Sequence, residues 1–198
     1  MSKNIIIIYV PGLGDKNLQG RQKALKLWRY RGVKVQVFGM DWSVDEPWAT
    51  KLSRLNKHIV SLKSENTSLT LVGESAGASA VTQALASNPN LIDGVVLLCG
   101  KSQYPELLGD SFTRPNPSLK DAVRSSSTVI AGLTPDQKTH MLNLHPVLDF
   151  IVPVKETRIL GVKNSTIPMI GHITSIAFGI TVWSWRIVRF ARLRANSA

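Results

Sequence analysis

The pentapeptide from Gly73 to Gly77, G-E-S-A-G, holds a residue type and spacing suited to nucleophilic chemistry. It follows the apolar run 69–72 and opens a segment of small residues that is typical of a helix. A strand, a G-x-S-x-G turn and a helix together raise a serine hydroxyl above the edge of a sheet. Ser75 would also lie at a helix N-terminus, where free N–H groups favour negative charge. We therefore expect Ser75 to be a nucleophile, the alternative being an ordinary Gly/Ser turn that enters a helix.

A nucleophilic serine needs a base, a carboxylate that orients the base, and two N–H donors for the oxyanion. Four histidines could be the base: His58, His140, His145 and His172. We expect the first to lie in an amphipathic helix and the second in a loop, both facing solvent. His145 lies in or beside a predicted strand and is the main competitor of His172, which directly follows the last predicted strand. His172 could also be a helix-capping or core residue.

The acidic partner has three candidates among the residues that follow predicted strands. Asp149 lies in the stretch L-D-F-I-V-P and could instead be a turn residue before Pro153. Asp41 also follows a strand, and Asp45 lies close behind it. Cys99 ends a strand, and we expect it to be a small buried hydrophobe rather than a nucleophile.

Six apolar runs, separated by helical segments, predict the strands that would position these side chains. The runs cover residues 4–10, 33–38, 69–72, 94–99, 141–148 and 166–170. Continuous apolar runs of this kind are typical of strands buried on both faces of a parallel sheet. Alternation of strands and helices indicates a parallel sheet with helices on both faces, joined by right-handed crossovers. In such sheets the chemistry lies at the carboxyl ends of the strands.

The intervening helices are predicted from periodicity and from start and stop signals. We expect them at 16–31 with Asp15 as the cap, from 47 to about 62, at 78–86, at 118–133, at 155–160, and as one long helix from 173 onward. The irregular region 100–117 could form a small flap from its apolar side chains, or a surface loop with buried anchors. The sequence shows neither a repeat nor a dividing linker, so we expect one domain over residues 1–198.

Composition limits the possible classes of function. With 43% hydrophobic residues the chain can build a globular core, and its single cysteine cannot form an internal disulfide. The apolar run near the N-terminus is too short for a signal peptide, so we expect a cytoplasmic protein. The net charge is +11, and the segments Lys16–Lys34 and Arg186–Arg194 carry basic residues without acidic ones. They could contact an anionic surface or be solvated helix faces.

Taken together, these motifs resemble the α/β-hydrolase superfamily in a minimal form that lacks the first two strands of that fold. The resemblance implies a three-layer sandwich with a mostly parallel sheet of about six strands. It implies Ser75 as nucleophile, Asp149 as the acid in a D-x-x-V-P setting, and His172 as the base on the loop after the final strand. The loop Gly12-Leu13-Gly14 is similar to the H-G-x-G oxyanion loop, with Pro11 in place of the histidine. By that likeness the oxyanion donors would be the backbone N–H groups of Leu13 and Ala76.

The resemblance further implies a serine hydrolase of carboxylic esters, an esterase or lipase ahead of a thioesterase or amidase. Its substrate would be a small ester or an acyl lipid, and it would need neither cofactor nor metal. The alternative is a catalytically silent lipid- or ligand-binding protein of the same fold. The sequence pI near 10.1 suggests the hypothesis of nucleic-acid binding, but we do not expect such binding because the sequence has no recognised nucleic-acid-binding motif. Peripheral contact with an anionic membrane could involve Lys16–Lys34 and Arg186–Arg194, whose neighbours include Trp183 and Trp185; oligomerisation through the Trp-rich end is the alternative.

Overall fold

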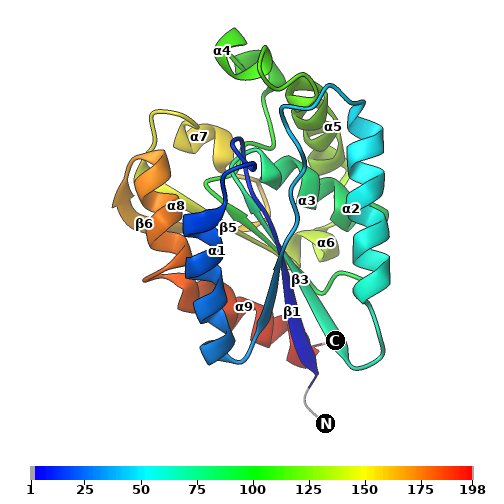
Figure 1. Ribbon diagram of the computed structural model, residues 1–198. Helices are drawn as coiled ribbons and strands as arrows, with labels where there is room; N and C mark the ends of the chain where they lie inside the picture. The colour runs from blue at the N-terminus through cyan, green and yellow to red at the C-terminus, as the bar shows by residue number, and fades with distance from the viewer. Residues whose placement is uncertain (1–2, 198) are drawn as a thin grey trace.

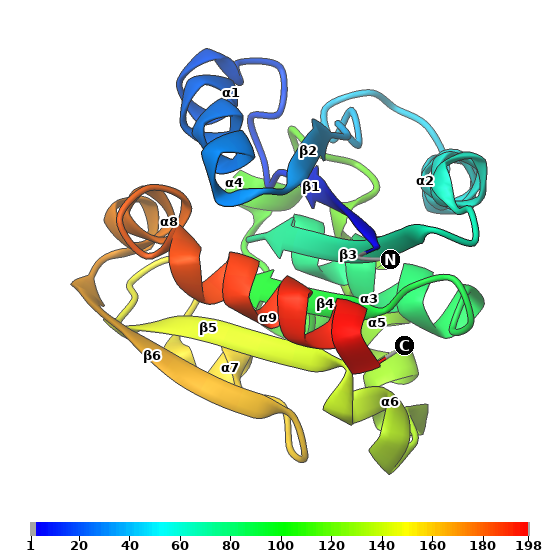
Figure 2. The same ribbon diagram turned by 90° about the horizontal axis from the view of Figure 1, so that it is seen from below.

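The computed structural model describes residues 3–197 as a parallel six-stranded sheet between two layers of helices (Figures 1 and 2). The strand order is β2-β1-β3-β4-β5-β6, and every pair of neighbours is parallel. The strands are β1 (Asn4–Val10), β2 (Lys34–Val37), β3 (Thr67–Glu74), β4 (Gly94–Leu98), β5 (Met141–Leu148) and β6 (Lys163–Ile170). The predicted sheet is thereby confirmed.

Helices cover both faces of the sheet. The helices and 3₁₀ turns (η) are α1 (Gln19–Lys26), η1 (Leu27–Arg31), α2 (Trp48–Leu62), α3 (Gly77–Ser87), η2 (Pro105–Leu107), α4 (Asp110–Thr113), α5 (Leu119–Gly132), α6 (Pro135–Thr139), α7 (Val154–Thr157), α8 (His172–Ile180) and α9 (Ser184–Ser197). Figure 2 shows α1, α8 and α9 on one face and α2, α3 and α5 on the other. Each layer therefore forms its own hydrophobic core with the sheet.

The central strands are largely apolar because they are covered on both sides, although β3 also buries Ser68, Thr70 and Glu74. In β1, Ile8 and Val10 belong to the core under α2 and α3, whereas Ile7 and Tyr9 belong to the core under α1 and α9. Successive side chains of a strand point to opposite faces, so both sets of positions must be apolar here. Because all the strands are parallel, the carboxyl ends of β1, β3, β4, β5 and β6 lie along one edge of the sheet.

The first helix differs from the expected span 16–31. It begins at Gln19 and ends at Lys26, and η1 continues it to Arg31. Asp15 does not cap it, because the Asp15 carboxylate accepts a hydrogen bond of 2.7 Å from the N–H of Asp41. Asp15 therefore ties the loop after β1 to the loop after β2.

The expected long helix from residue 173 onward is two helices. Thr181, with φ −107° and ψ −88°, leaves the helical conformation between α8 and α9. The indole N–H of Trp28 donates to the carbonyl of Ile180 at 2.8 Å, which anchors the break to η1. The break lets α9 turn and pack along β1, β3 and β4. Within the described residues, the helices all fall short of the length and apolar character that a bilayer crossing requires.

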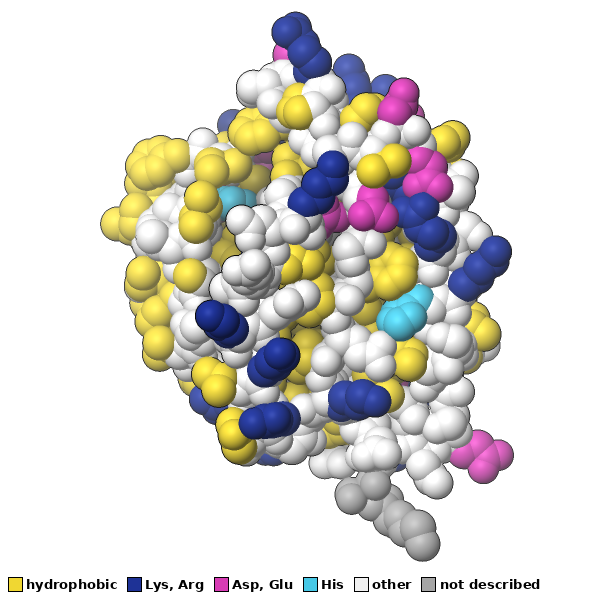
Figure 3. All heavy atoms as spheres, viewed as in Figure 1, with side chains coloured by type: hydrophobic (Ala, Val, Ile, Leu, Met, Phe, Trp, Pro, Cys, Tyr) yellow, Lys and Arg dark blue, Asp and Glu magenta, His cyan; other side chains and the backbone are white. Residues whose placement is uncertain are grey.

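The two basic segments meet on the α1/α9 side of the molecule. Arg192 of α9 donates a hydrogen bond to the carbonyl of Arg31 at the end of η1. The guanidinium of Arg186 lies over two aromatic rings, 4.9 Å from the centre of Trp183 and 5.3 Å from that of Trp185. In Figure 3, the lower left, where α1 lies, shows Lys and Arg side chains without acidic neighbours, whereas at the upper right Lys and Arg are mixed with Asp and Glu.

The join between β3 and α3 is closely packed. A Cβ on Gly73 would lie 2.6 Å from the Cα of Ala78, the carbonyl oxygen of Gly77 and a methyl group of Val81. Two of these atoms belong to the backbone and have no rotamer through which to move away. Helix α3 can therefore sit this close to β3 only if residue 73 has no side chain.

We predict that Gly73→Ala lowers the free energy of unfolding by about 1–3 kcal/mol, the usual cost of overpacking. The matched control is Gly132→Ala, because a Cβ at Gly132 meets nothing within 4 Å. There the free energy of unfolding should stay constant or rise by about 0.5 kcal/mol. Urea denaturation of both variants at one pH measures the difference, and equal effects would contradict this view of the join.

Candidate active site

Ser75 sits in the strained turn that a nucleophile elbow requires. Its φ is +49°, a left-handed conformation that a residue with a side chain rarely adopts. The Ser75 N–H donates to the carbonyl of Leu98 at 2.9 Å, and the Ser75 carbonyl accepts from the N–H of Lys101 at 2.9 Å. A Cβ on Gly77 would run into the carbonyl of Val10, so α3 crosses directly over the end of β1. The strain is thus held by backbone contacts from two neighbouring strands.

His172 is the histidine that reaches Ser75. It opens α8 directly after Gly171, whose φ of +91° turns the chain from β6 into the helix. Its Nε2 lies 2.9 Å from Ser75 Oγ, and its Nδ1 lies 2.7 Å from Asp149 Oδ2. An ionised carboxylate can only accept, so the proton belongs on Nδ1 and Nε2 is left to accept from the serine hydroxyl.

Asp149 is buried just beyond the end of β5, with 4% of its surface exposed. The N–H groups of Ile151 and Val152 donate to its Oδ1 at 2.8 and 2.9 Å, and His172 bonds to its Oδ2. Burial by itself would raise the pKa of this carboxyl. The hydrogen bonds from His172, Val152 and Ile151 together outweigh burial, and the pKa of Asp149 is lowered from its ordinary value. Asp149 is therefore held as the carboxylate.

The competing residues lie elsewhere. The Asp41 side chain is 57% exposed and pairs with Arg54 at 3.3 Å, and Asp45 is exposed. His145 is buried, and its Nδ1 lies 2.9 Å from the carbonyl of Pro146 rather than near Ser75. Burial raises the pKa of the Cys99 thiol, which keeps it protonated and poorly nucleophilic.

The remaining two histidines differ from expectation because neither is freely exposed. His58 is half-buried, with its ring centre 5.1 Å from that of Phe38. His140 is half-buried against the guanidinium of Arg194. Amphipathic spacing alone places a residue on the outer side of a helix but does not reveal which neighbouring element covers it.

The two expected oxyanion donors adjoin the serine. Leu13 and Ala76 both line the cavity that contains Ser75. A Cβ on Gly12 would lie 2.7 Å from the Cβ of Ser75, so the loop after β1 approaches the elbow as closely as a glycine allows. Over residues 3–197, neither the N–H of Leu13 nor that of Ala76 donates to a protein acceptor. Within the described residues, neither N–H group is therefore committed to a bond of the fold.

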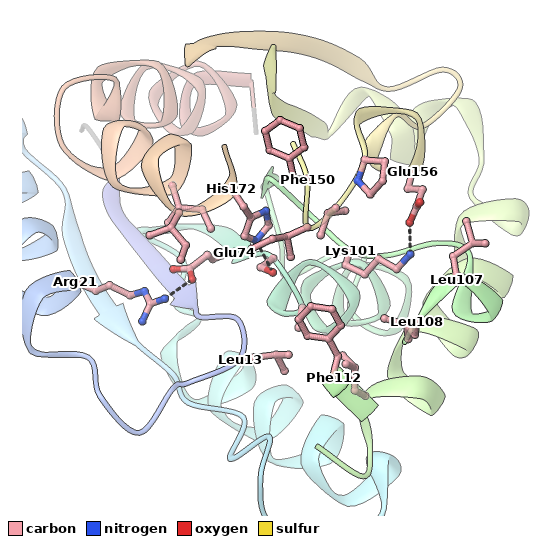
Figure 4. A pocket seen from close by; sticks show the side chains of 18 residues that line it. Leu13, Arg21, Glu74, Lys101, Leu107, Leu108, Phe112, Phe150, Glu156 and His172 are labelled. Carbon is pink, nitrogen blue, oxygen red and sulfur yellow. Dashed lines mark hydrogen bonds and ion pairs between the residues drawn. The ribbon is translucent and has the colours of Figure 1, made fainter. Parts of the chain in front are cut away.

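The cavity in front of Ser75 has a volume of about 370 Å³ and a largely apolar wall (Figure 4). Leu107, Leu108 and Phe112, from the segment expected to form a flap, line one side. Phe150 and Ile173 line another side and are 77% and 73% exposed, so the cavity opens to the surface there. The shape and lining suit a ligand with an apolar part.

Two charged pairs in the cavity wall were not expected from the sequence. Arg21 of α1 donates to Glu74 at 2.8 Å, and the buried Tyr9 hydroxyl donates to the other oxygen of Glu74. Burial, followed by the charge of Glu74, raises the pKa of Tyr9 well above its ordinary value. Lys101, just beyond β4, pairs with Glu156 of α7. In each pair, the sequence could have drawn attention to the charged residue at or just beyond the end of an apolar strand. The residues around it, however, do not indicate which side chain it pairs with.

The described part of the chain contains no group of three or more His, Cys, Asp or Glu side chains arranged to hold a metal ion. The acidic groups near Ser75 are already engaged: Asp149 with His172, Glu74 with Arg21 and Tyr9, and Glu156 with Lys101.

Comparison with known proteins gives matches in structure but not in sequence. No protein-family model and no curated protein sequence matches the chain. A structure from work on LipS and LipT, two metagenome-derived lipolytic enzymes, aligns with a TM-score of 0.70 at 12% identity, over 100% of this chain and 96% of the other. Est1E from Butyrivibrio proteoclasticus aligns with 0.65 at 16%, over 100% and 90%.

A third similar structure is that of a protein described as an α/β hydrolase. MGS-MChE2, an α/β-hydrolase enzyme from the metagenome of lagoon sediments of Mar Chica, Morocco, aligns with a TM-score of 0.66 at 16% identity, over 95% of this chain and 93% of the other. At such identities the likeness concerns the fold alone. Together with the all-parallel six-stranded sheet, it shows that this chain has the α/β-hydrolase fold.

Proposed function

We propose that the protein is a serine hydrolase that cleaves carboxylic esters, with Ser75, His172 and Asp149 as its catalytic triad. The observation that carries the proposal is the chain of two hydrogen bonds, 2.9 Å from Ser75 to His172 and 2.7 Å from His172 to Asp149. The strained φ of Ser75 supports it as well, because such strain persists only where surrounding structure maintains it.

In this mechanism Ser75 Oγ attacks the ester carbonyl while His172 Nε2 accepts the hydroxyl proton. Asp149 holds the imidazole in place and stabilises its cation. The N–H groups of Leu13 and Ala76 donate to the oxyanion that forms on the carbonyl oxygen. His172 then returns the proton to the departing alcohol, which leaves an acyl group on Ser75. Water, activated by His172, releases the acid and restores the serine.

The substrate would be a small ester or an acyl lipid. The largely apolar cavity favours an acyl chain over a charged group, and its open side at Phe150 would admit substrate from the surface. Structural neighbours described as lipolytic enzymes and as an α/β-hydrolase enzyme add support by analogy. A catalytically silent binding protein would share the cavity but would leave Ser75 unreactive.

The first test is covalent labelling with a fluorophosphonate probe. We expect wild type to label, Ser75→Ala not to label, and His172→Ala to label at least about 100-fold more slowly, because the base is lost. His58→Ala is the matched control and should label at the wild-type rate, since His58 lies on α2 against Phe38. A folded wild-type protein that does not label would favour the silent binding protein.

The second test is Asp149→Asn. The amide keeps an oxygen acceptor for the N–H groups of Ile151 and Val152 but presents a donor to Nδ1 of His172. The imidazole then adopts the tautomer with its proton on Nε2, which cannot accept the proton of Ser75. We expect the rate of ester cleavage to fall by about 10⁴-fold with the fold retained. Steady-state kinetics on a p-nitrophenyl ester measures it, and a loss below about tenfold would contradict the role of Asp149.

The same variant tests the acid dependence of stability. Because the pKa of Asp149 is lower in the folded protein, the unfolded chain binds more protons between the two pKa values. The resulting stabilisation is complete above the unfolded value, about 3.9, and is lost as pH falls through the folded value. Unfolding free energies measured below about pH 5 should therefore decline less steeply for Asp149→Asn than for wild type. Parallel curves would show that the carboxylate is not stabilised by folding.

We further propose that the joined basic segments bind an anionic lipid surface. Arg192 joins the two segments through the carbonyl of Arg31. The half-buried Arg186 lies over Trp183 and Trp185, and aromatic residues beside basic ones suit a lipid interface. Each cation near such a surface contributes about 1 kcal/mol at physiological salt.

Co-sedimentation with vesicles rich in phosphatidylserine tests this second proposal. The triple variant Lys26→Gln, Arg29→Gln, Arg189→Gln removes three exposed charges from the basic surface and should lower binding by about 100-fold or more. The control Lys57→Gln, Arg114→Gln, Lys120→Gln removes the same charge from exposed positions elsewhere and should lower it much less. Equal losses would mean that net charge alone drives binding, and absence of binding at low salt would overturn the proposal.

A further inference from the structure

The ion pair between Lys101 and Glu156 is an unusual part of the cavity wall. Both side chains are buried, with 6% and 7% exposed, and both line the cavity that contains Ser75. Figure 4 shows the pair on the side of the cavity marked by Leu107, across from Arg21. Lys101 is also fixed relative to the nucleophile, because its N–H donates to the carbonyl of Ser75 at 2.9 Å.

Stability alone does not account for a pair in this position. Removing two charges from water costs several kcal/mol per ion, and apolar residues of similar volume often stabilise a fold as well or better. The neighbouring wall is apolar and includes Leu107, Leu108 and Pro153, so an apolar pair would pack there without difficulty. A charged pair beside the reacting serine therefore suggests a role with the ligand.

The hydrogen-bonding capacity of the pair exceeds what the protein uses. A lysine ammonium has three N–H donors, and a carboxylate has two acceptor oxygens. Among residues 3–197, the Lys101 ammonium has one acceptor, Oε2 of Glu156, and Oε1 of Glu156 accepts from no protein donor. Since both residues line the cavity, the remaining donors and acceptor lie in its wall.

The charge balance of the pair selects the kind of group that fits. A substrate carboxylate would be drawn to Lys101 but repelled by Glu156, and an ammonium would meet the reverse. A hydroxyl can accept from the Lys101 ammonium and donate to Oε1 of Glu156 at the same time. A neutral group that both donates and accepts therefore satisfies the pair without separating it.

We propose that Lys101 and Glu156 form a hydroxyl-binding subsite and that the preferred substrates are esters that carry a hydroxyl group. This proposal rests on the proposed function, because it concerns the substrate of the same site. Lys101 is tied to Ser75 through the backbone, so a hydroxyl bound here also places the ester at a fixed position relative to the nucleophile. The benefit should appear in kcat/KM for hydroxylated esters.

The test compares each hydroxylated ester with its unsubstituted parent. One series of p-nitrophenyl esters has the hydroxyl moved along the acyl chain, and a second series has it on the alcohol, as in glycol monoesters. We expect at least one position to raise kcat/KM about tenfold or more over the parent, the scale of a hydrogen bond to a charged group. Replacing that hydroxyl by a carboxylate or an amine should abolish the gain.

The double variant Lys101→Met, Glu156→Leu removes both charges together, so that neither is left buried alone. We expect the ratio of kcat/KM for the hydroxylated ester to that for its parent to fall to about one. The matched control is Asp121→Leu, Arg124→Met, which removes an exposed ion pair on α5 and should keep the wild-type ratio. A pair that only stabilises the fold would lower the melting temperature and leave the ratio intact.

The possible outcomes separate the two proposals. If the esters are cleaved but no hydroxyl position is preferred by wild type, the subsite is overturned and the hydrolase stands. If wild type shows a preference that the double variant retains, the hydroxyl is bound elsewhere and the subsite is again overturned. If the double variant does not fold, Glu156→Gln replaces it, and this variant should reduce the ratio because Oε1 is lost as a charged acceptor. If Ser75 does not label and no ester reacts, the proposed function fails and the subsite with it.

Discussion

The close contact between the turn after β3 and the loop after β1 sets the geometry of the whole site. Gly12 lies against Ser75, and Gly77 lies against the end of β1, with no room for a Cβ at either position. Ser75 adopts its left-handed backbone conformation at this contact, and Leu13 and Ala76 line the same cavity. Because backbone atoms make the contact, it is stiff, and small errors in position cost much of the benefit of a preorganised site.

Electrostatics provides the second constraint on the site. Three carboxylates, Glu74, Asp149 and Glu156, are buried near Ser75, and a carboxylate that was unpaired there would be very unfavourable. Each is bound to a different partner from a distant part of the chain: Arg21, His172 and Lys101. The charges of Glu74 and Glu156 are thus balanced by Arg21 and Lys101, whereas Asp149 is stabilised as a carboxylate by hydrogen bonds.

These pairs also connect the loops and helices around the site to the sheet. Glu74 joins β3 to α1, which follows the loop after β1, and Asp149 joins the end of β5 to the start of α8. Glu156 joins α7, in the segment that follows Asp149, to the end of β4. The loops around the cavity are therefore anchored by hydrogen bonds rather than only by apolar packing, which makes the geometry specific.

The sequence alone determined the strand order along the chain, the parallel sheet and the residues at the strand ends, since strands covered on both faces are largely apolar on both. It also identified Ser75, Asp149 and His172 as residues to be brought together, although their roles remain a proposal. The tertiary structure decided the rest. The pairs Arg21–Glu74 and Lys101–Glu156 join residues 53 and 55 positions apart, and the break before α9 depends on Trp28. Such contacts depend on how elements cross in space, and local periodicity carries no information about a partner on another element.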